Sequence, residues 1–223
     1  MPRARDLGIE LGRLPAGPAN AITDVAGVRV GHTTLIEGDD VRTGVTVVVP
    51  PPEPLFAGAH RINGNGELTG LEWVRDSGLL TTPVGLTNTH SVGVVRDAIV
   101  AARPPGDWDW ALPGVGETWD GLLNDINGQR VTREHVFAAF ERAAAGPVEE
   151  GSVGGGTGMV CHGFKGGIGT SSRAVADGWT VGALVQANHG RRARLRVNGV
   201  PVGERIGPEL VPTPGRGGPE GAG

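Results

Sequence analysis

The residue types that most often carry chemistry are sparse in this chain, and their spacing excludes several common sites. It has six histidines and a single cysteine, Cys161. One cysteine can form neither an intrachain disulfide nor a zinc site built from several cysteines. No two histidines have the helical spacing of a metal-binding pair, so we expect no metal. Adjacent side chains in a strand point to opposite faces, so Cys161 and His162 are not expected to form a dyad.

A glycine-rich segment, GGGTG at 154–158, looks at first like a phosphate-binding loop. It lacks the Gly-Lys-Ser/Thr ending that brings a lysine to the phosphates. Two interpretations stay open: a packed turn where backbones approach closely, or a loop of an active site. The chain has neither a Gly-x-Ser-x-Gly elbow nor a Ser-x-x-Lys motif, and no nucleophile can be identified from local motifs.

Composition favours one globular α/β unit among the 223 residues. Hydrophobic residues make up 38%, and the 40 glycines and 17 prolines alternate with valine-rich runs, which indicates many tight turns. The net charge of −4 argues against a nucleic-acid partner. No apolar run is long enough to span a membrane, and no apolar signal core follows the N-terminus. We therefore expect a cytoplasmic protein.

Hydrophobic periodicity gives the elements that must position any site. It predicts strands at 28–36, 41–49, 84–88, 157–164, 167–174, 179–187 and 194–198. It predicts helices at 68–76, 91–103, 117–126 and 133–145. Asn198 and Gly199 read as a hairpin turn, and residues 212–223 carry no apolar pattern and are expected to be a mobile tail.

Seven longer stretches are individually distinctive. They are NAITDVAGVRVG (20–31), NGNGELTG (63–70), TNTHSVGVVRD (87–97), ETWDGLLNDING (117–128), EGSVGGGTGM (150–159), FKGGIGTSSR (164–173) and VQANHG (185–190). In this order they resemble the DmpA-type aminopeptidases (peptidase family S58), which include β-aminopeptidases and nylon-oligomer hydrolases. The resemblance covers about residues 3–212.

The resemblance implies an α/β fold of the αββα four-layer sandwich type, shared with ornithine acetyltransferases. Family members cut themselves before a Ser or Thr, which becomes the N-terminal nucleophile of a β chain. This chain resembles the α chain only, with residues 1–211 as its part of a single catalytic domain and a tail ending at the cleavage residue Gly223. The resemblance further implies αβ heterodimers that assemble into larger oligomers, without a cofactor.

Three site residues follow from the same resemblance. Asn188 is expected to donate to the oxyanion of the tetrahedral intermediate, although it could also merely cap a strand. Glu117 is expected to bind the substrate ammonium, the alternative being a favourable interaction with a helix dipole. Trp119 stands where many relatives carry a tyrosine that donates to the oxyanion; it is either a donor through its indole N–H or a core residue.

The sequence thus predicts the α subunit of a hydrolase, an aminopeptidase or amidase that releases small N-terminal residues from short peptides or amides. Two alternatives remain: a self-cleaving acyltransferase of the ornithine acetyltransferase type, whose threonine-containing cleavage motif is not visible, or a non-catalytic binding relative.

Overall fold

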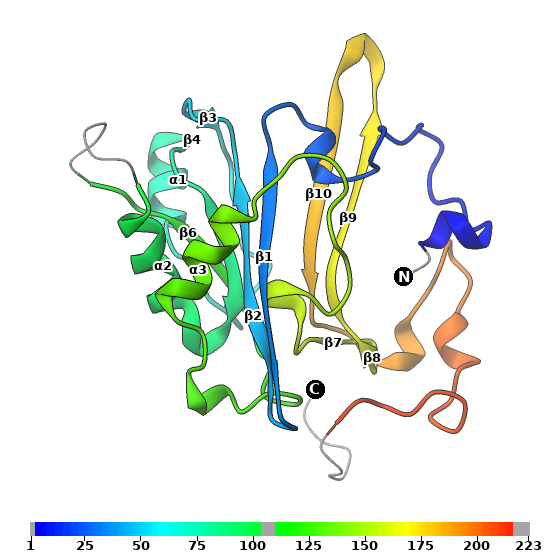
Figure 1. Cartoon of the computed structure of the whole chain (residues 1–223). Helices are drawn as coiled ribbons and strands as arrows, with labels where there is room; N and C mark the ends of the chain where they lie inside the picture. Colours follow the sequence, from blue (N-terminus) through cyan, green and yellow to red (C-terminus); the bar gives the residue numbers. More distant parts are fainter. Residues whose placement is uncertain (1–2, 104–109, 216–223) are drawn as a thin grey trace.

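The computed structural model describes residues 3–103 and 110–215 and arranges them in layers of helix and sheet (Figure 1). One layer is a four-stranded sheet in the order β1 (Arg29–Glu37), β2 (Val41–Val49), β5 (Val84–Asn88) and β6 (Gly114–Thr118). β1 pairs antiparallel with β2, and β2 with β5. β5 and β6 run parallel, with α2 (Val92–Ala101) in the connection between them. Gly223 and residues 216–222 of the predicted tail lie outside the described residues.

Two helices cover one face of this sheet. α3 (Arg133–Glu141) packs on β1 and β2, and α2 packs on β5 and β6. The core between them is built largely from valines, of which Val45, Val47 and Val95 are fully buried. β-branched side chains suit a pleated surface of this kind, which explains the valine-rich runs. At the edge, β3 (Leu55–Phe56) and β4 (Leu79–Leu80) form a small antiparallel pair, and α1 (Leu71–Ser77) lies in the connection between them and packs on β4.

A second sheet faces the first, and a turn of bare backbone separates them. β9 (Gly167–Ala174) and β10 (Thr180–Ala187) form an antiparallel hairpin beside β1 and β2 (Figure 1). The turn η5 (Gly154–Gly156) is buried and packs on strands of both sheets. A Cβ at Gly155 would lie 2.5 Å from the Leu86 carbonyl oxygen, so only glycine fits there.

Short segments complete the described part of the chain. β7 (Val160–Cys161) and β8 (Phe164–Lys165) form a small hairpin before β9. None of the helices in the described residues is long and apolar enough to cross a bilayer. The remaining 3₁₀ turns are η1 (Ala4–Leu7), η2 (Ile22–Asp24), η3 (Thr89–Ser91), η4 (Ile126–Gly128), η6 (Ala176–Gly178), η7 (Arg192–Arg194) and η8 (Val202–Glu204).

Most of the predicted elements are confirmed to within a few residues, but the helix predicted at 117–126 is wrong. The chain extends as β6 to Thr118 and makes one helical turn, in which the Asn124 N–H donates to the Asp120 carbonyl at 3.0 Å. The next amide, that of Asp125, donates instead to the Asp40 carbonyl at 2.6 Å, before β2. This long-range bond ends the helical turn.

Two of the predicted strands are also wrong. Residues 157–164 contain β7 and the start of β8, joined by a tight turn at His162 and Gly163. Residues 194–198 follow the turn η7 and form only an isolated bridge between Val197 and Val200. The predicted hairpin turn inside that bridge is confirmed, because Asn198 and Gly199 both have positive φ angles, 50° and 84°.

A buried carboxylate joins the ends of three strands. Asp120 is completely buried, and its two oxygens accept hydrogen bonds from Asn88 Nδ2 and Asn124 Nδ2, both at 3.1 Å. Asn88 Nδ2 also donates to Thr43 Oγ1 at 2.8 Å, which links β2 and β5 to the end of β6. Burial raises the pKa of Asp120 above its usual 3.8, and hydrogen bonds from Thr43, Asn124 and Asn88 oppose this shift.

The raised pKa of Asp120 predicts a specific dependence of stability on pH. Folding favours the neutral carboxyl, so its contribution is complete below pH 3.8 and is lost as pH rises through the raised folded pKa. Asp120→Asn is neutral at every pH. In urea unfolding across pH, the stability of wild type minus that of Asp120→Asn should therefore fall as pH rises. The exposed Asp76→Asn is the control; a difference that stays constant with pH contradicts the prediction.

The buried glycine turn predicts the second effect on stability. Gly155→Ala drives a methyl group into the Leu86 carbonyl and should destabilise the fold by about 1–3 kcal/mol, as overpacking usually does. Gly93→Ala is the matched control, because Gly93 lies in α2 with open space around it and alanine favours a helix by about 1 kcal/mol. Thermal unfolding should give a lower melting temperature for Gly155→Ala than for Gly93→Ala. Equal melting temperatures would contradict the prediction and would mean that the two sheets can separate to make room for the methyl group.

Candidate active site

One cavity collects all three predicted site residues that lie in the described part of the chain. It has a volume of about 660 Å³ and lies where β5, β6 and β10 end. Glu117 and Trp119 come from the end of β6, and Asn188 follows β10 directly. The complete lining is Gly64, Asn65, Gly66, Thr89, Glu117, Thr118, Trp119, Leu122, Gly158, Val160, Asn188, His189 and Gly190.

The Glu117 carboxylate is held in place from two sides. Its Oε1 accepts the backbone N–H of Glu67 at 2.9 Å, and its Oε2 accepts the Thr89 hydroxyl at 2.5 Å. Within residues 3–103 and 110–215 it forms no ion pair with an arginine, lysine or histidine. Because Glu117 lies within strand β6, the expected helix start is wrong, and the helix-dipole alternative loses its basis. The site therefore presents a fixed carboxylate to a cationic ligand.

Asn188 is oriented by the backbone on both sides of the cavity. Its Oδ1 accepts the N–H of Val160 at 3.0 Å, and its Nδ2 donates to the Trp119 carbonyl at 2.9 Å. These two bonds assign the amide orientation, because the Val160 N–H can only donate and the Trp119 carbonyl can only accept. In the described residues, Nδ2 donates no other hydrogen bond, so its second N–H can serve a ligand.

Trp119 is a wall of the cavity rather than a core residue. It is 50% exposed, and its indole lies against the bare backbone of Gly121. The core alternative is therefore wrong. Its backbone carbonyl also fixes Asn188, which gives Trp119 a positioning role that sequence reasoning did not foresee.

The glycine-rich segment is a packed turn, the first of the two open interpretations. Gly154, Gly155 and Gly156 are buried between the sheets and offer no cradle for a phosphate. The active-site interpretation holds only for Gly158, which lines the cavity.

Sequence reasoning missed the partners of these residues. Thr89 and the 64–67 loop fix Glu117, and Gln186 bridges the two sheets by donating to the Thr87 carbonyl at 2.9 Å and the Thr118 hydroxyl at 2.7 Å. Thr89, the 64–67 loop and Gln186 fall inside the distinctive stretches 63–70, 87–97 and 185–190, which was the available signal. Val160, whose N–H holds Asn188, lies outside all seven stretches and gave none.

Three possible metal ligands also come together beside this cavity. Sγ of Cys161 and one ring nitrogen from each of His162 and His189 lie within 4.8 Å of one another. The expectation that Cys161 and His162 diverge is wrong, because the strand ends at Cys161 and His162 adopts a positive φ of 53° in the turn. Alternation of side chains applies only within an extended strand.

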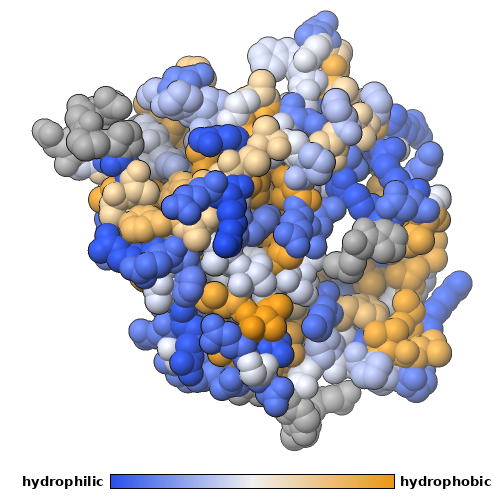
Figure 2. All heavy atoms as spheres, in the orientation of Figure 1, coloured by the Kyte–Doolittle hydropathy of each residue, from blue (hydrophilic) through white to orange (hydrophobic). Residues whose placement is uncertain are grey.

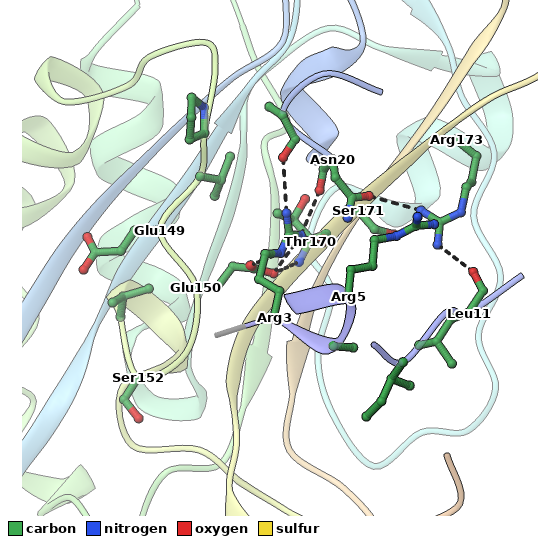
Figure 3. Close-up of a pocket in the computed structure, with 16 residues that line it drawn as sticks. Arg3, Arg5, Leu11, Asn20, Glu149, Glu150, Ser152, Thr170, Ser171 and Arg173 are labelled. Atoms are coloured by element: carbon green, nitrogen blue, oxygen red, sulfur yellow. Dashed lines mark hydrogen bonds and ion pairs between the residues drawn. The ribbon is translucent and has the colours of Figure 1, made fainter. Parts of the chain in front are cut away.

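A larger cavity of about 880 Å³ lies elsewhere, between the N-terminal segment and β9. Figure 3 shows two of its arginines directed at the protein itself: Arg3 lies beside Glu150 and Thr170, and Arg173 points toward Leu11 and Asn20. Arg3 Nε is 2.8 Å from Glu150 Oε2, and Arg173 donates to the Leu11 carbonyl at 3.1 Å. These contacts fasten the N-terminal segment to the second sheet.

Comparisons with known proteins agree with this geometry. The model of peptidase family S58 matches residues 20–217. A β-aminopeptidase from Burkholderia sp. superposes with a TM-score of 0.89 at 59% identity, covering 92% of this chain and 62% of that one. The L-aminopeptidase D-Ala-esterase/amidase of Ochrobactrum anthropi, described as a variant of the Ntn hydrolase fold, gives 0.86 at 48% identity, covering 92% and 63%. These structures confirm the predicted fold class.

Among curated sequences, the β-peptidyl aminopeptidase BapA of Sphingosinicella microcystinivorans is 51% identical over 228 residues, covering 95% of this chain. The alignment spans 57% of that relative, so this chain corresponds to little more than half of the relative's length. The family match and these identities agree over nearly the whole chain, which therefore belongs to peptidase family S58.

Proposed function

We propose that this chain is the α-chain part of a cytoplasmic, self-processing aminopeptidase or amidase that releases small N-terminal residues from short peptides or amides. The observation that carries this proposal is the pairing, in one cavity, of a fixed carboxylate, Glu117, with an oriented neutral donor, Asn188. A substrate with a free amine needs the first group, and the oxyanion formed when its amide is attacked needs the second.

The reaction divides its groups between two polypeptides. The hydroxyl of an N-terminal Ser or Thr, supplied by the β chain, attacks the substrate carbonyl after losing its proton to a base such as its own α-amine. The developing oxyanion accepts the second N–H of Asn188, and the ammonium of the substrate pairs with Glu117. Trp119 bounds the cavity and holds Asn188 through its carbonyl, so it positions the donor.

An incomplete surface supports the β-chain partner. β9 and β10 form a sheet of only two strands in the described part of the chain, and such sheets are rarely stable alone. The outward face of β10 exposes Val181, Ala183 and Val185. Val200 and Leu210, in the segment that follows β10, are exposed as well. Figure 2 shows hydrophobic side chains on the side of the molecule where Figure 1 draws this segment. Apolar surface of this kind favours a partner, and we propose assembly into oligomers of αβ heterodimers.

The acyltransferase alternative is not favoured, because the relatives that match are named as aminopeptidases. Those names include β-peptidyl aminopeptidase and L-aminopeptidase D-Ala-esterase/amidase, so β-amino and D-configured substrates belong in the first screen.

The role of Asn188 is tested with Asn188→Ala in the processed enzyme. Loss of one oxyanion donor should lower kcat by about 10²–10³. KM should change less, because the bond matters mainly in the transition state. The exposed Asn127→Ala is the matched control. Steady-state kinetics on variants whose processing has been verified by intact mass decide the question, and an unchanged kcat removes Asn188 from the reaction.

The role of Glu117 is tested with a matched substrate pair, alanine amide and N-acetyl-alanine amide. Glu117→Gln keeps the shape and deletes the charge, so kcat/KM for the free amine should fall by about 10–100-fold, the usual range for a charged hydrogen bond. The ratio of kcat/KM for alanine amide to kcat/KM for N-acetyl-alanine amide should therefore decrease. Glu53→Gln, at an exposed site, controls for charge alone. If wild type and Glu117→Gln select equally between the two substrates, the amine is recognised elsewhere.

A further inference from the structure

We propose that Cys161, His162 and His189 form a binding site for one Zn²⁺-like transition-metal ion beside the active-site cavity. Their ligand atoms lie within 4.8 Å of one another in the described structure. Thiolate sulfur and imidazole nitrogen are the donors that zinc prefers, and three protein ligands with a fourth position left to water is a common zinc arrangement.

The local backbone brings these side chains together. His162 and Gly163 have positive φ angles of 53° and 70° and form the tight turn between β7 and β8. The His162 N–H donates to the His189 carbonyl at 2.7 Å, which joins this turn to the segment after β10. Arg192 donates to the Gly163 carbonyl and stacks on Phe164 with its guanidinium carbon 4.3 Å from the ring centroid. The turn is therefore fastened on both sides.

One histidine is already oriented as metal-ligating histidines usually are. Nδ1 of His162 lies 3.1 Å from the Arg191 carbonyl oxygen, and a carbonyl can only accept, so Nδ1 carries the proton. This leaves the lone pair on Nε2 for a metal. The His162 ring lies over Gly190, where any Cβ would collide with it, and Gly190 itself has a φ of 84°. The ring thus packs on bare backbone.

The remaining ligands are accessible. His189 is exposed and lines the cavity, and Cys161 is a half-buried free thiol. Zinc bonds of about 2.0–2.3 Å place tetrahedral ligand atoms about 3.3–3.8 Å apart, so the three side chains need to close by roughly 1 Å. Side-chain rotation of the exposed His189 can supply much of this movement. Binding releases the thiol proton of Cys161 to solvent.

The site is coupled to Asn188 through the chain on both sides. Cys161 follows Val160, whose N–H holds Asn188 Oδ1 at 3.0 Å, and His189 follows Asn188 itself. A metal that draws Cys161 and His189 together therefore displaces the donor amide, and we expect Zn²⁺ to lower kcat. This second part rests on the proposed role of Asn188, whereas metal binding does not.

Metal binding is tested on the processed enzyme with all its chains, with Zn²⁺ in calorimetry and Co²⁺ in absorption spectroscopy. Wild type should bind one Zn²⁺ per copy of this chain, and the Co²⁺ form should show a thiolate-to-metal charge-transfer band. Cys161→Ser, nearly isosteric, should abolish the band, and both it and His189→Ala should weaken Zn²⁺ binding by at least about 10²-fold, the upper range for outer-shell changes.

The exposed His60→Ala is the matched control and should bind metal as wild type does. Absence of saturable binding, or equal binding by wild type and Cys161→Ser, overturns the site whatever the activity of the enzyme. Coupling is measured separately: Zn²⁺ should reduce kcat of wild type and leave kcat of Cys161→Ser unchanged. Equal inhibition of both overturns the coupling.

Discussion

The close contact between the two sheets at η5 is the constraint on which the site depends. Backbone without side chains fills the gap there, because a Cβ at Gly155 would reach the Leu86 carbonyl and one at Gly156 would lie 2.5 Å from the Ile168 nitrogen. Gln186 crosses the same gap and donates to groups of β5 and β6. The ends of β6 and β10 are thereby fixed relative to each other. Glu117, near the end of β6, and Asn188, directly after β10, therefore line a single cavity. The abundance of glycine in this chain thus serves packing density as well as turns.

Two carboxylates three residues apart have opposite environments, and this difference assigns their roles. Asp120 is completely buried among neutral donors, and burial raises its pKa, so it cannot reach a ligand and serves to join strand ends. Glu117 faces the cavity and is oriented by Thr89 and the Glu67 amide. Glu117 lies within β6, where side chains alternate between the two faces of the sheet, whereas Asp120 lies beyond the end of β6 at Thr118. In the proposed reaction, the neutral amide of Asn188 would stabilise a developing oxyanion without competing with the substrate ammonium for Glu117.

The local sequence pattern was sufficient to predict those strands and helices whose formation depends on interactions between residues close in sequence. Strands β1, β2, β5, β9 and β10 and helices α2 and α3 follow their hydrophobic periodicity. Trp119, Leu122, Leu123 and Ile126 have helical spacing too, yet the Asp125 amide bonds to Asp40, far away in the sequence, and periodicity carries no information about that partner. The same limit applies to Cys161 and His162, whose convergence depends on a positive φ at a non-glycine residue. The candidate site residues were identified by resemblance to the family. The hydrogen-bond partners that orient them could be identified only from the folded structure.

In the proposed function, the cavity of this chain binds the charged groups of the substrate and does not supply the nucleophile. Glu117 and Asn188 are both fixed by groups of this same chain, namely Thr89, Val160 and the Trp119 carbonyl. The proposed β chain is therefore not needed to orient these two side chains. The outward apolar face of β10 lies on the strand that leads into Asn188. A partner that covers this face, as the proposed β chain would, therefore packs on the strand that leads into Asn188, and its docking would act on the position of the Asn188 side chain.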